Sequence, residues 1–171
     1  LPLGGRTLRF FHTPWVHWPE TLCSWLEEDR ILFTCDFFGS HLATTDREAT
    51  DECRVYEAAK RYYAEIMMPF RGQIRSHLAR LGELPIATIA PSHGPIYPRP
   101  AFIMEAYRDW VSESCKNIAV IPYVSMHGST EQLVRALVAR LATRNVTVHL
   151  FDLAVTDLGR LAEALVDAAT V

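Results

Sequence analysis

Apolar residues in the first 112 positions recur with two different periods, which predict strands and helices. Short β-prone runs bounded by polar loops indicate strands at 6–11, 21–27, 31–36 and 84–91. A tight polar turn joins the second run to the third, so these two strands are expected to form a hairpin. Spacings of three and four residues predict helices over 55–67, from Pro69 to Gly82, and over 102–111.

The pattern changes near residues 114–117. The predicted order beyond this point is strand 118–124, helix 130–143, strand 146–152, helix 158–169 and the start of a strand at Thr170-Val171. This order indicates a βαβ unit with a parallel sheet. Its first helix carries Leu133, Leu137 and Leu141 on one side. The predicted fold class is therefore α/β, with α+β character in the first part and a boundary at about 112–117.

Composition excludes several classes of protein. With 49% hydrophobic and 22% charged residues among 171, the chain matches an ordinary globular protein rather than a disordered one. No apolar run reaches the roughly 18 residues of a membrane span, and the net charge of −3 lacks the basic excess of a nucleic-acid binder. Four cysteines without a C-x-x-C pair favour reduced thiols in a cytoplasmic protein.

Both ends of the chain suggest that it is an internal part of a longer protein. It begins at Leu1 without Met, and it stops at Val171 inside an apolar element. Ending there would leave a core unfinished, so we expect an internal fragment.

Three residues of the first part lie where predicted strands end: His17, Asp36 and His93. Imidazole and carboxylate groups are ligands for iron, manganese or zinc, and the two oxygens of Asp36 could bridge two cations. Cys35 is adjacent to Asp36 on the expected strand and should therefore point to the opposite face, into the core. A loop histidine is most often merely exposed, so that alternative stays open for His17 and His93. Exposure is the interpretation for the remaining histidines, His12, His41, His77 and His149.

A second candidate site lies where the strand at 118–124 leads into the next helix. Its loop offers hydroxyls, a glycine for a tight turn and the free N–H groups of a helix N-terminus, a combination that binds phosphate. The residues concerned are Ser125, Met126, His127, Gly128, Ser129 and Thr130. Neither G-x-G-x-x-G nor G-K-[ST] is present, so FMN is favoured over NAD and ATP. The alternative is an ordinary helix N-cap made by Ser129 or Thr130.

Four motifs together resemble the flavodiiron proteins. They are HTPWVHWPET (12–21), LFTCDFFGSH (32–41), RYYAEIMMPF (61–70) and APSHGPIY (90–97), and they occur in the order of that family. Flavodiiron proteins join a metallo-β-lactamase-like diiron domain to a flavodoxin-like FMN domain. The resemblance therefore implies that residues 1–113 are the C-terminal part of the diiron domain and residues 117–171 the N-terminal part of the flavodoxin-like domain.

The resemblance also implies roles for single residues. His17 and His93 would be iron ligands and Asp36 the carboxylate that bridges the two irons. Trp18 would lie near the metals and the incoming flavin, although a loop-anchoring aromatic is an equal alternative. Residues 125–130 would bind the FMN phosphate. The family's upstream H-x-E-x-D motif, which supplies three more ligands, is absent from this sequence, as are the later strands that hold the flavin ring.

As part of a flavodiiron protein, the chain would serve the reduction of O₂ to water or of NO to N₂O. FMN would receive electrons from a rubredoxin or an NADH-linked reductase, and a head-to-tail homodimer would bring the flavin of one subunit to the irons of the other. No nucleic acid or membrane partner is expected. Two alternatives remain: a dinuclear-metal hydrolase that uses zinc to activate water, and a cofactor-free inactive fragment or binding module.

Overall fold

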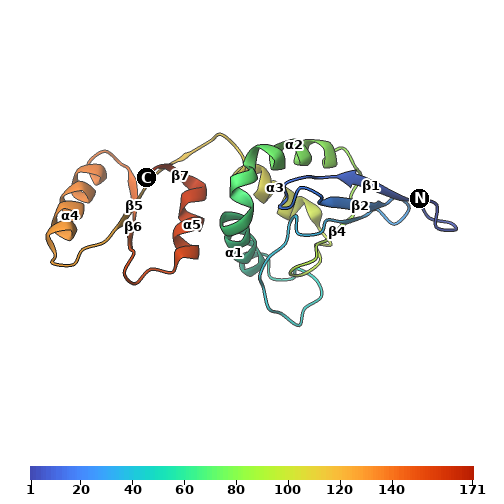
Figure 1. The fold of residues 1–171 in the computed structure, drawn as a ribbon, viewed down its shortest axis with the longest axis horizontal. Coiled ribbons are helices and arrows are strands. Elements are labelled where there is room, and N and C mark those ends of the chain that lie inside the picture. Colours follow the sequence, from blue (N-terminus) through green and yellow to red (C-terminus); the bar gives the residue numbers. More distant parts are fainter. The chain divides into compact units, whose positions relative to one another are not determined.

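The computed structural model describes residues 1–171 and separates them into two units, Leu1–Ser112 and Glu113–Val171 (Figure 1). The first unit is built around a mixed four-stranded sheet. Its strands, in spatial order, are β1 (Leu8–His12), β2 (Leu22–Leu26), β3 (Ile31–Phe33) and β4 (Thr88–Ala90). The pairs β1–β2 and β2–β3 are antiparallel, which confirms the predicted hairpin, and β3–β4 is parallel.

The helices of the first unit follow one another with little interruption, as the 3–4 spacing predicts. A π-helical turn and a 3₁₀ turn separate the first two, and Pro69 lies in the 3₁₀ turn rather than in the second helix. Gly82 ends the second helix, and its N–H donates to Leu78 O at 2.9 Å. The elements are α1 (Glu52–Tyr62), η1 (Tyr63–Met67), η2 (Met68–Phe70), α2 (Arg71–Leu81) and α3 (Pro100–Trp110).

The two faces of this sheet differ in burial. Cys23, Trp25 and Leu32 on one face are at most 2% exposed and belong to the core. Phe10 and Phe33 both align with Ser24 across the strands, so they share the opposite face. There Phe10 is 55% and Phe33 is 44% exposed. Within this chain, the second face of the sheet therefore remains apolar and open to solvent.

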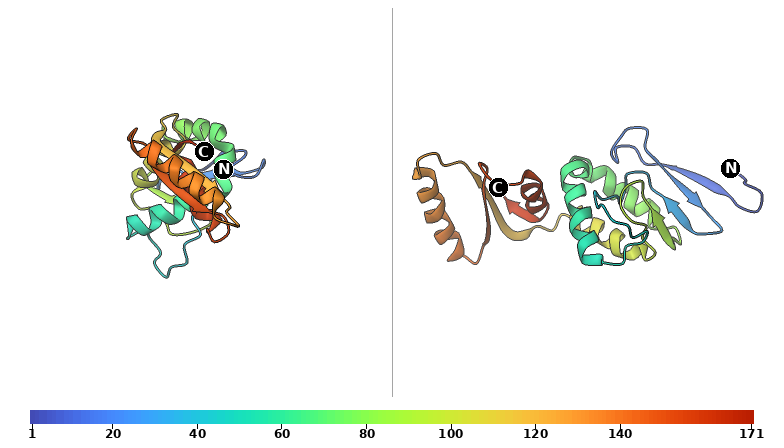
Figure 2. Two further views of the ribbon diagram at one scale, coloured as in Figure 1. Left: turned by 90° about the vertical axis from the view of Figure 1, so that its left-hand side faces the viewer. Right: turned by 90° about the horizontal axis from the view of Figure 1, so that it is seen from below.

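The second unit is a parallel three-stranded sheet in the order β6-β5-β7. Its elements are β5 (Lys116–Tyr123), α4 (Ser129–Ala142), β6 (Thr147–Asp152), α5 (Leu158–Asp167) and β7 (Ala168–Thr170). Helices α4 and α5 lie on opposite faces of the sheet (Figures 1 and 2). This arrangement confirms the βαβ prediction and the α/β fold class, with a third strand starting at Ala168.

The buried side of α4 is not the one that the leucine spacing suggested. Leu133 is 71% and Leu137 is 45% exposed, whereas Val134 is only 7% exposed. The sheet contacted by α4 is narrow, so it covers the valine side and leaves the neighbouring leucines in solvent. Spacing predicts an apolar stripe, but the width of the covering layer decides which part of that stripe is buried.

Candidate functional site

Three loops at one edge of the first sheet carry the predicted metal ligands. His17 lies between β1 and β2, Asp36 follows β3, and His93 follows β4. Because β3 and β4 are parallel, the loops that leave them emerge side by side. Two backbone hydrogen bonds join these loops, from Ser92 N to Cys35 O at 2.7 Å and from Ser40 N to His93 O at 3.1 Å.

The structure brings the side chains of His17, Asp36 and His93 together, although they are far apart in the sequence. His17 Nε2 lies 3.4 Å from Asp36 Oδ2, and His93 Nε2 lies 3.3 Å from Asp36 Oδ1. Both separations exceed the usual N–H···O hydrogen-bond length of about 2.7–3.2 Å. Each imidazole therefore faces a different oxygen of one carboxylate.

These separations fit two metal ions that share Asp36. Two donors bound to one ion at about 2.0–2.2 Å, with tetrahedral to octahedral angles between them, stand about 2.8–3.6 Å apart. His17 with Oδ2 matches one such pair, and His93 with Oδ1 matches the other. Each pair could therefore supply two donors to one ion, and no three of the His, Cys, Asp or Glu side chains are arranged to hold a metal ion.

The turn that presents Asp36 has an unusual backbone. Cys35 and Phe38 have φ values of +53° and +65°, a region that residues other than glycine seldom adopt and that is over-represented at functional sites. The expectation that Cys35 points into the core is wrong: burial alternates from Leu32 to Cys35, with Leu32 and Thr34 buried and Phe33 and Cys35 exposed. The rings of Phe37 and Phe38, both fully buried, stack at 3.9 Å and anchor the turn to the core.

Two glycines allow the loops around Asp36 and His93 to approach each other. Gly94 has φ +81°, and a Cβ built on it would lie 2.2 Å from the Oγ of Ser40. A Cβ at Gly39 would lie 2.9 Å from the carbonyl oxygen of Asp36 and 3.4 Å from the Cβ of His93. The spacing of the two ligand loops therefore depends on the absence of side chains at both positions.

Sequence reasoning missed two residues beside His93. The ring of His41 lies 6.0 Å from that of His93 and 4.7 Å from that of Tyr62, while Tyr62 lies 6.1 Å from His93. Burial, together with the negative charge of Asp36, raises the pKa of the Tyr62 phenol, so it stays protonated. In the sequence, Tyr62 is indistinguishable from the other apolar residues of its helical stripe, and His41 resembles any exposed loop histidine.

The predictions for Trp18 and for the other histidines have different outcomes. Trp18 is 58% exposed, and its ring lies 5.3 Å from that of His17, so it borders the site without being anchored by burial. His12, His41 and His149 are exposed, as expected. The expectation of an exposed His77 is wrong: it is 8% exposed, and its Nε2 lies 2.9 Å from Pro14 O. The reason is a contact between α2 and a loop 63 residues earlier, which helix periodicity does not reveal.

The predicted phosphate loop joins β5 to α4. Gly128, with φ +79°, occupies the N-cap position, and no side chain of that residue can cap the helix. The alternative of a cap made by Ser129 or Thr130 is wrong, since α4 already begins at Ser129; Ser125 Oγ instead accepts from Glu131 N at 3.3 Å. Met126, His127, Ser129 and Thr130 are exposed. Backbone N–H groups at such a helix start attract anions.

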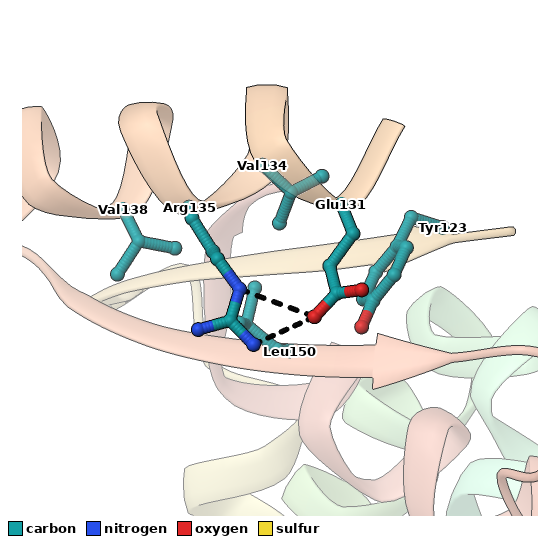
Figure 3. A pocket seen from close by; sticks show the side chains of 6 residues that line it. All are labelled: Tyr123, Glu131, Val134, Arg135, Val138 and Leu150. Atoms are coloured by element: carbon teal, nitrogen blue, oxygen red, sulfur yellow. Dashed lines mark hydrogen bonds and ion pairs between the residues drawn. The ribbon is translucent and has the colours of Figure 1, made fainter. Parts of the chain in front are cut away.

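An apolar pocket lies under α4, next to this loop but separate from it (Figure 3). Glu131 and Arg135 of α4 are paired at 2.6 Å, and Leu150 projects toward them from β6 (Figure 3). Its lining residues are Tyr123, Glu131, Val134, Arg135, Val138 and Leu150. None of the predicted phosphate-binding residues contributes to it.

Comparisons with known proteins match both units. The model of the family described as ODP family beta lactamase matches residues 1–94. The chain is 37% identical to a nitric oxide reductase of Moorella thermoacetica and 32% identical to a coenzyme F420H(2) oxidase of Methanothermobacter marburgensis, covering 99% and 100% of this chain and 44% of each relative. The structure of rubredoxin oxygen:oxidoreductase from Desulfovibrio gigas superposes with a TM-score of 0.92 at 28% identity, over 98% of this chain and 44% of that one.

The flavodiiron protein of Giardia intestinalis superposes with a TM-score of 0.88 at 30% identity, over 96% of this chain and 41% of that one. The chain thus spans less than half the length of the relatives that it matches. None of its helices combines the length and apolar character needed to cross a bilayer.

Proposed function

Since the chain belongs to the ODP family of β-lactamase-like proteins, the flavodiiron oxidoreductases, we propose that it supplies part of the diiron site and the phosphate anchor of an O₂ or NO reductase. Residues 1–113 are then the C-terminal part of the diiron domain, and residues 117–171 are the first part of the FMN domain. The observation that carries this proposal is the pair of histidines on opposite oxygens of Asp36.

In the proposed site, His17 and Asp36 would hold one iron, while His93 and Asp36 would hold the other. When bound, two irons would supply redox-active Lewis-acid chemistry suited to the reduction of O₂ or NO. The carboxylate of Asp36 places negative charge between two cations, which reduces their mutual repulsion. Further ligands must come from outside these 171 residues, because this chain offers two donors to each ion.

The surrounding residues have separate tasks. Tyr62 keeps its phenolic proton beside Asp36 and is therefore a hydrogen-bond donor on the His93 side of the site. Trp18, exposed next to His17, offers an aromatic face where a flavin could approach. The loop 125–130 holds the FMN phosphate through the N–H groups at the start of α4 and the nearby hydroxyls.

The names of relatives support an electron-transfer role. One solved neighbour is named for rubredoxin and oxygen, and relatives are named for nitric oxide and for coenzyme F420H(2). We therefore propose that the loop 125–130 anchors an FMN that would carry electrons from a rubredoxin or an NADH-linked reductase, in a head-to-tail homodimer located in the cytoplasm. The four free cysteines are compatible with a reducing compartment.

The test replaces Asp36 with Asn in the native protein and measures iron, zinc and FMN per chain together with O₂ and NO consumption. Loss of the bridging charge should release at least one iron per chain and abolish reduction, with FMN unchanged. Asp46→Asn, at an exposed acidic residue of another loop, is the matched control. Retention of two irons and full activity by Asp36→Asn would refute the bridging role. Zinc in the wild-type protein would favour the hydrolase alternative.

A further inference from the structure

The segment His12–Thr21, called the His17 loop below, is closed by its own hydrogen bonds. Thr13 N donates to Thr21 O at 2.9 Å across its base, and Trp15 N donates to Trp18 O at 2.8 Å within it. The Nε2 atom of His12 lies 3.2 Å from the carbonyl oxygen of Pro19. These bonds give the loop a shape, but they do not fix it to the rest of the unit.

Two side chains of α2 bind carbonyl groups of the loop, in addition to the packing of Val16, which is fully buried, and of Trp15, whose ring stacks on Phe70 at 6.0 Å. His77 Nε2 lies 2.9 Å from Pro14 O, and the Arg80 guanidinium donates to His12 O. Residues three apart on a helix lie on one face. One face of α2 therefore holds two carbonyl groups of the His17 loop, two residues apart, just before the predicted ligand.

The protonation of His77 follows from its surroundings. Pro14 O can only accept, so Nε2 must carry the proton, which is possible in the neutral ring. Burial lowers the pKa of His77, and the nearby Arg80 and His12 act in the same direction. His77 is therefore a neutral donor on the buried side of the loop, and Arg80 is a cationic donor at its exposed start.

We propose that His77 and Arg80 are positioning residues that fix the His17 loop on α2 and thereby hold His17 against Oδ2 of Asp36. The inference rests on the proposed function, in which His17 is an iron ligand. It adds an asymmetry to the site: His93 is held by the backbone bond from Ser40 and does not depend on α2. Loss of the contacts from His77 and Arg80 should therefore weaken iron binding on the His17 side and leave iron binding on the His93 side unchanged.

The experiment compares His77→Leu and His77→Gln in the native protein. Leucine fills the space without a donor, whereas the amide of glutamine can place an N–H near the former Nε2. Arg80→Met tests the second contact at an exposed position where folding is not at risk, and Ser76→Leu on the exposed side of α2 is the control.

Two measurements separate this inference from the proposed function. Amide hydrogen exchange in residues 13–21 of the metal-free protein should accelerate about two- to tenfold in His77→Leu and Arg80→Met, the range set by the loss of one hydrogen bond. His77→Gln and Ser76→Leu should exchange like the wild type. Iron content should fall from two to one per chain in His77→Leu and recover in His77→Gln.

Equal behaviour of the leucine and glutamine variants, or acceleration spread over the whole first unit, would overturn the positioning role. A wild-type protein without iron would instead refute the proposed function. The rate of amide hydrogen exchange in residues 13–21 would still decide whether His77 and Arg80 fix the His17 loop on α2.

Discussion

Replacement of Gly94 by alanine should destabilise the first unit, and the structure gives the size of the effect. At φ +81°, a side chain costs about 1–2 kcal/mol. The new Cβ would also lie 2.2 Å from Ser40 Oγ and 3.1 Å from Ser40 O, and crowding of this kind costs about 1–3 kcal/mol. The expected loss in the free energy of unfolding is therefore about 2–5 kcal/mol.

A double-mutant cycle separates the two contributions. Ser40 Oγ is buried without a hydrogen-bond partner, so Ser40→Ala alone should cost little. In Ser40→Ala/Gly94→Ala, the closest contact disappears, and about 1–3 kcal/mol should be recovered as coupling energy. Gly4→Ala, at φ +67° with nothing within 4 Å of the added Cβ, is the control for the backbone contribution alone.

Urea unfolding followed by tryptophan fluorescence reports the first unit alone, because all four tryptophans of the chain lie within residues 1–112. If Gly94→Ala costs no more than Gly4→Ala, or if the double variant shows no coupling, the close approach of the two ligand loops is not a constraint on the fold.

The two remaining predictions concern His77 and the phosphate loop. The pKa of His77 is lower in the native state than its unfolded value of about 6.5, so between these two values only the unfolded chain takes up the proton. The stability of the first unit should therefore fall as the pH drops below about 6.5, and it should fall less steeply in His77→Gln. Urea midpoints that change equally in the wild type and in His77→Gln from pH 7.5 to 5.5 would contradict this. In the native protein, Gly128→Val and Ser129→Ala should weaken the binding of FMN more than that of riboflavin. For Ser129→Ala the affinity for FMN should fall roughly 10- to 150-fold, a loss of about 1.5–3 kcal/mol. Fluorescence titrations that show equal losses of affinity for both flavins would exclude phosphate binding.

Local patterns predicted the element types well because each reflects a short-range rule. The hairpin, the order of strands and helices in the βαβ unit and the helices themselves follow from patterns of neighbouring residues, and all appear in the structure, although the leucines of α4 stay largely exposed. Their ends were predicted less well. The run 84–91 looked like one strand, but only Thr88–Ala90 pairs with β3, since the length of a strand depends on the partner available to it.

The errors at the site have different physical origins. Alternation counted from Asp36 predicts a buried Cys35, but the observed alternation of burial places Cys35 with the exposed Phe33. Helix periodicity predicts an exposed His77, which is instead buried beside Pro14, 63 residues earlier in the chain. A dependence on distant segments likewise hid His41 and Tyr62, whose proximity to His93 arises only from the packing of three separate elements.

The position of Asp36 shows why the sequence can predict a candidate ligand but not the geometry of the turn that carries it. The carboxylate belongs to a turn whose conformation is set by its neighbours: Thr34 Oγ1 donates to Phe37 O at 2.6 Å, and Tyr97 OH donates to Phe38 O at 2.9 Å. Both acceptors belong to buried phenylalanines, so the core holds the turn in place before any ion binds. A side chain fixed in this way loses little conformational freedom on ligation. In the proposed metal site, the aromatic core would therefore contribute to metal affinity as well as to the stability of the fold.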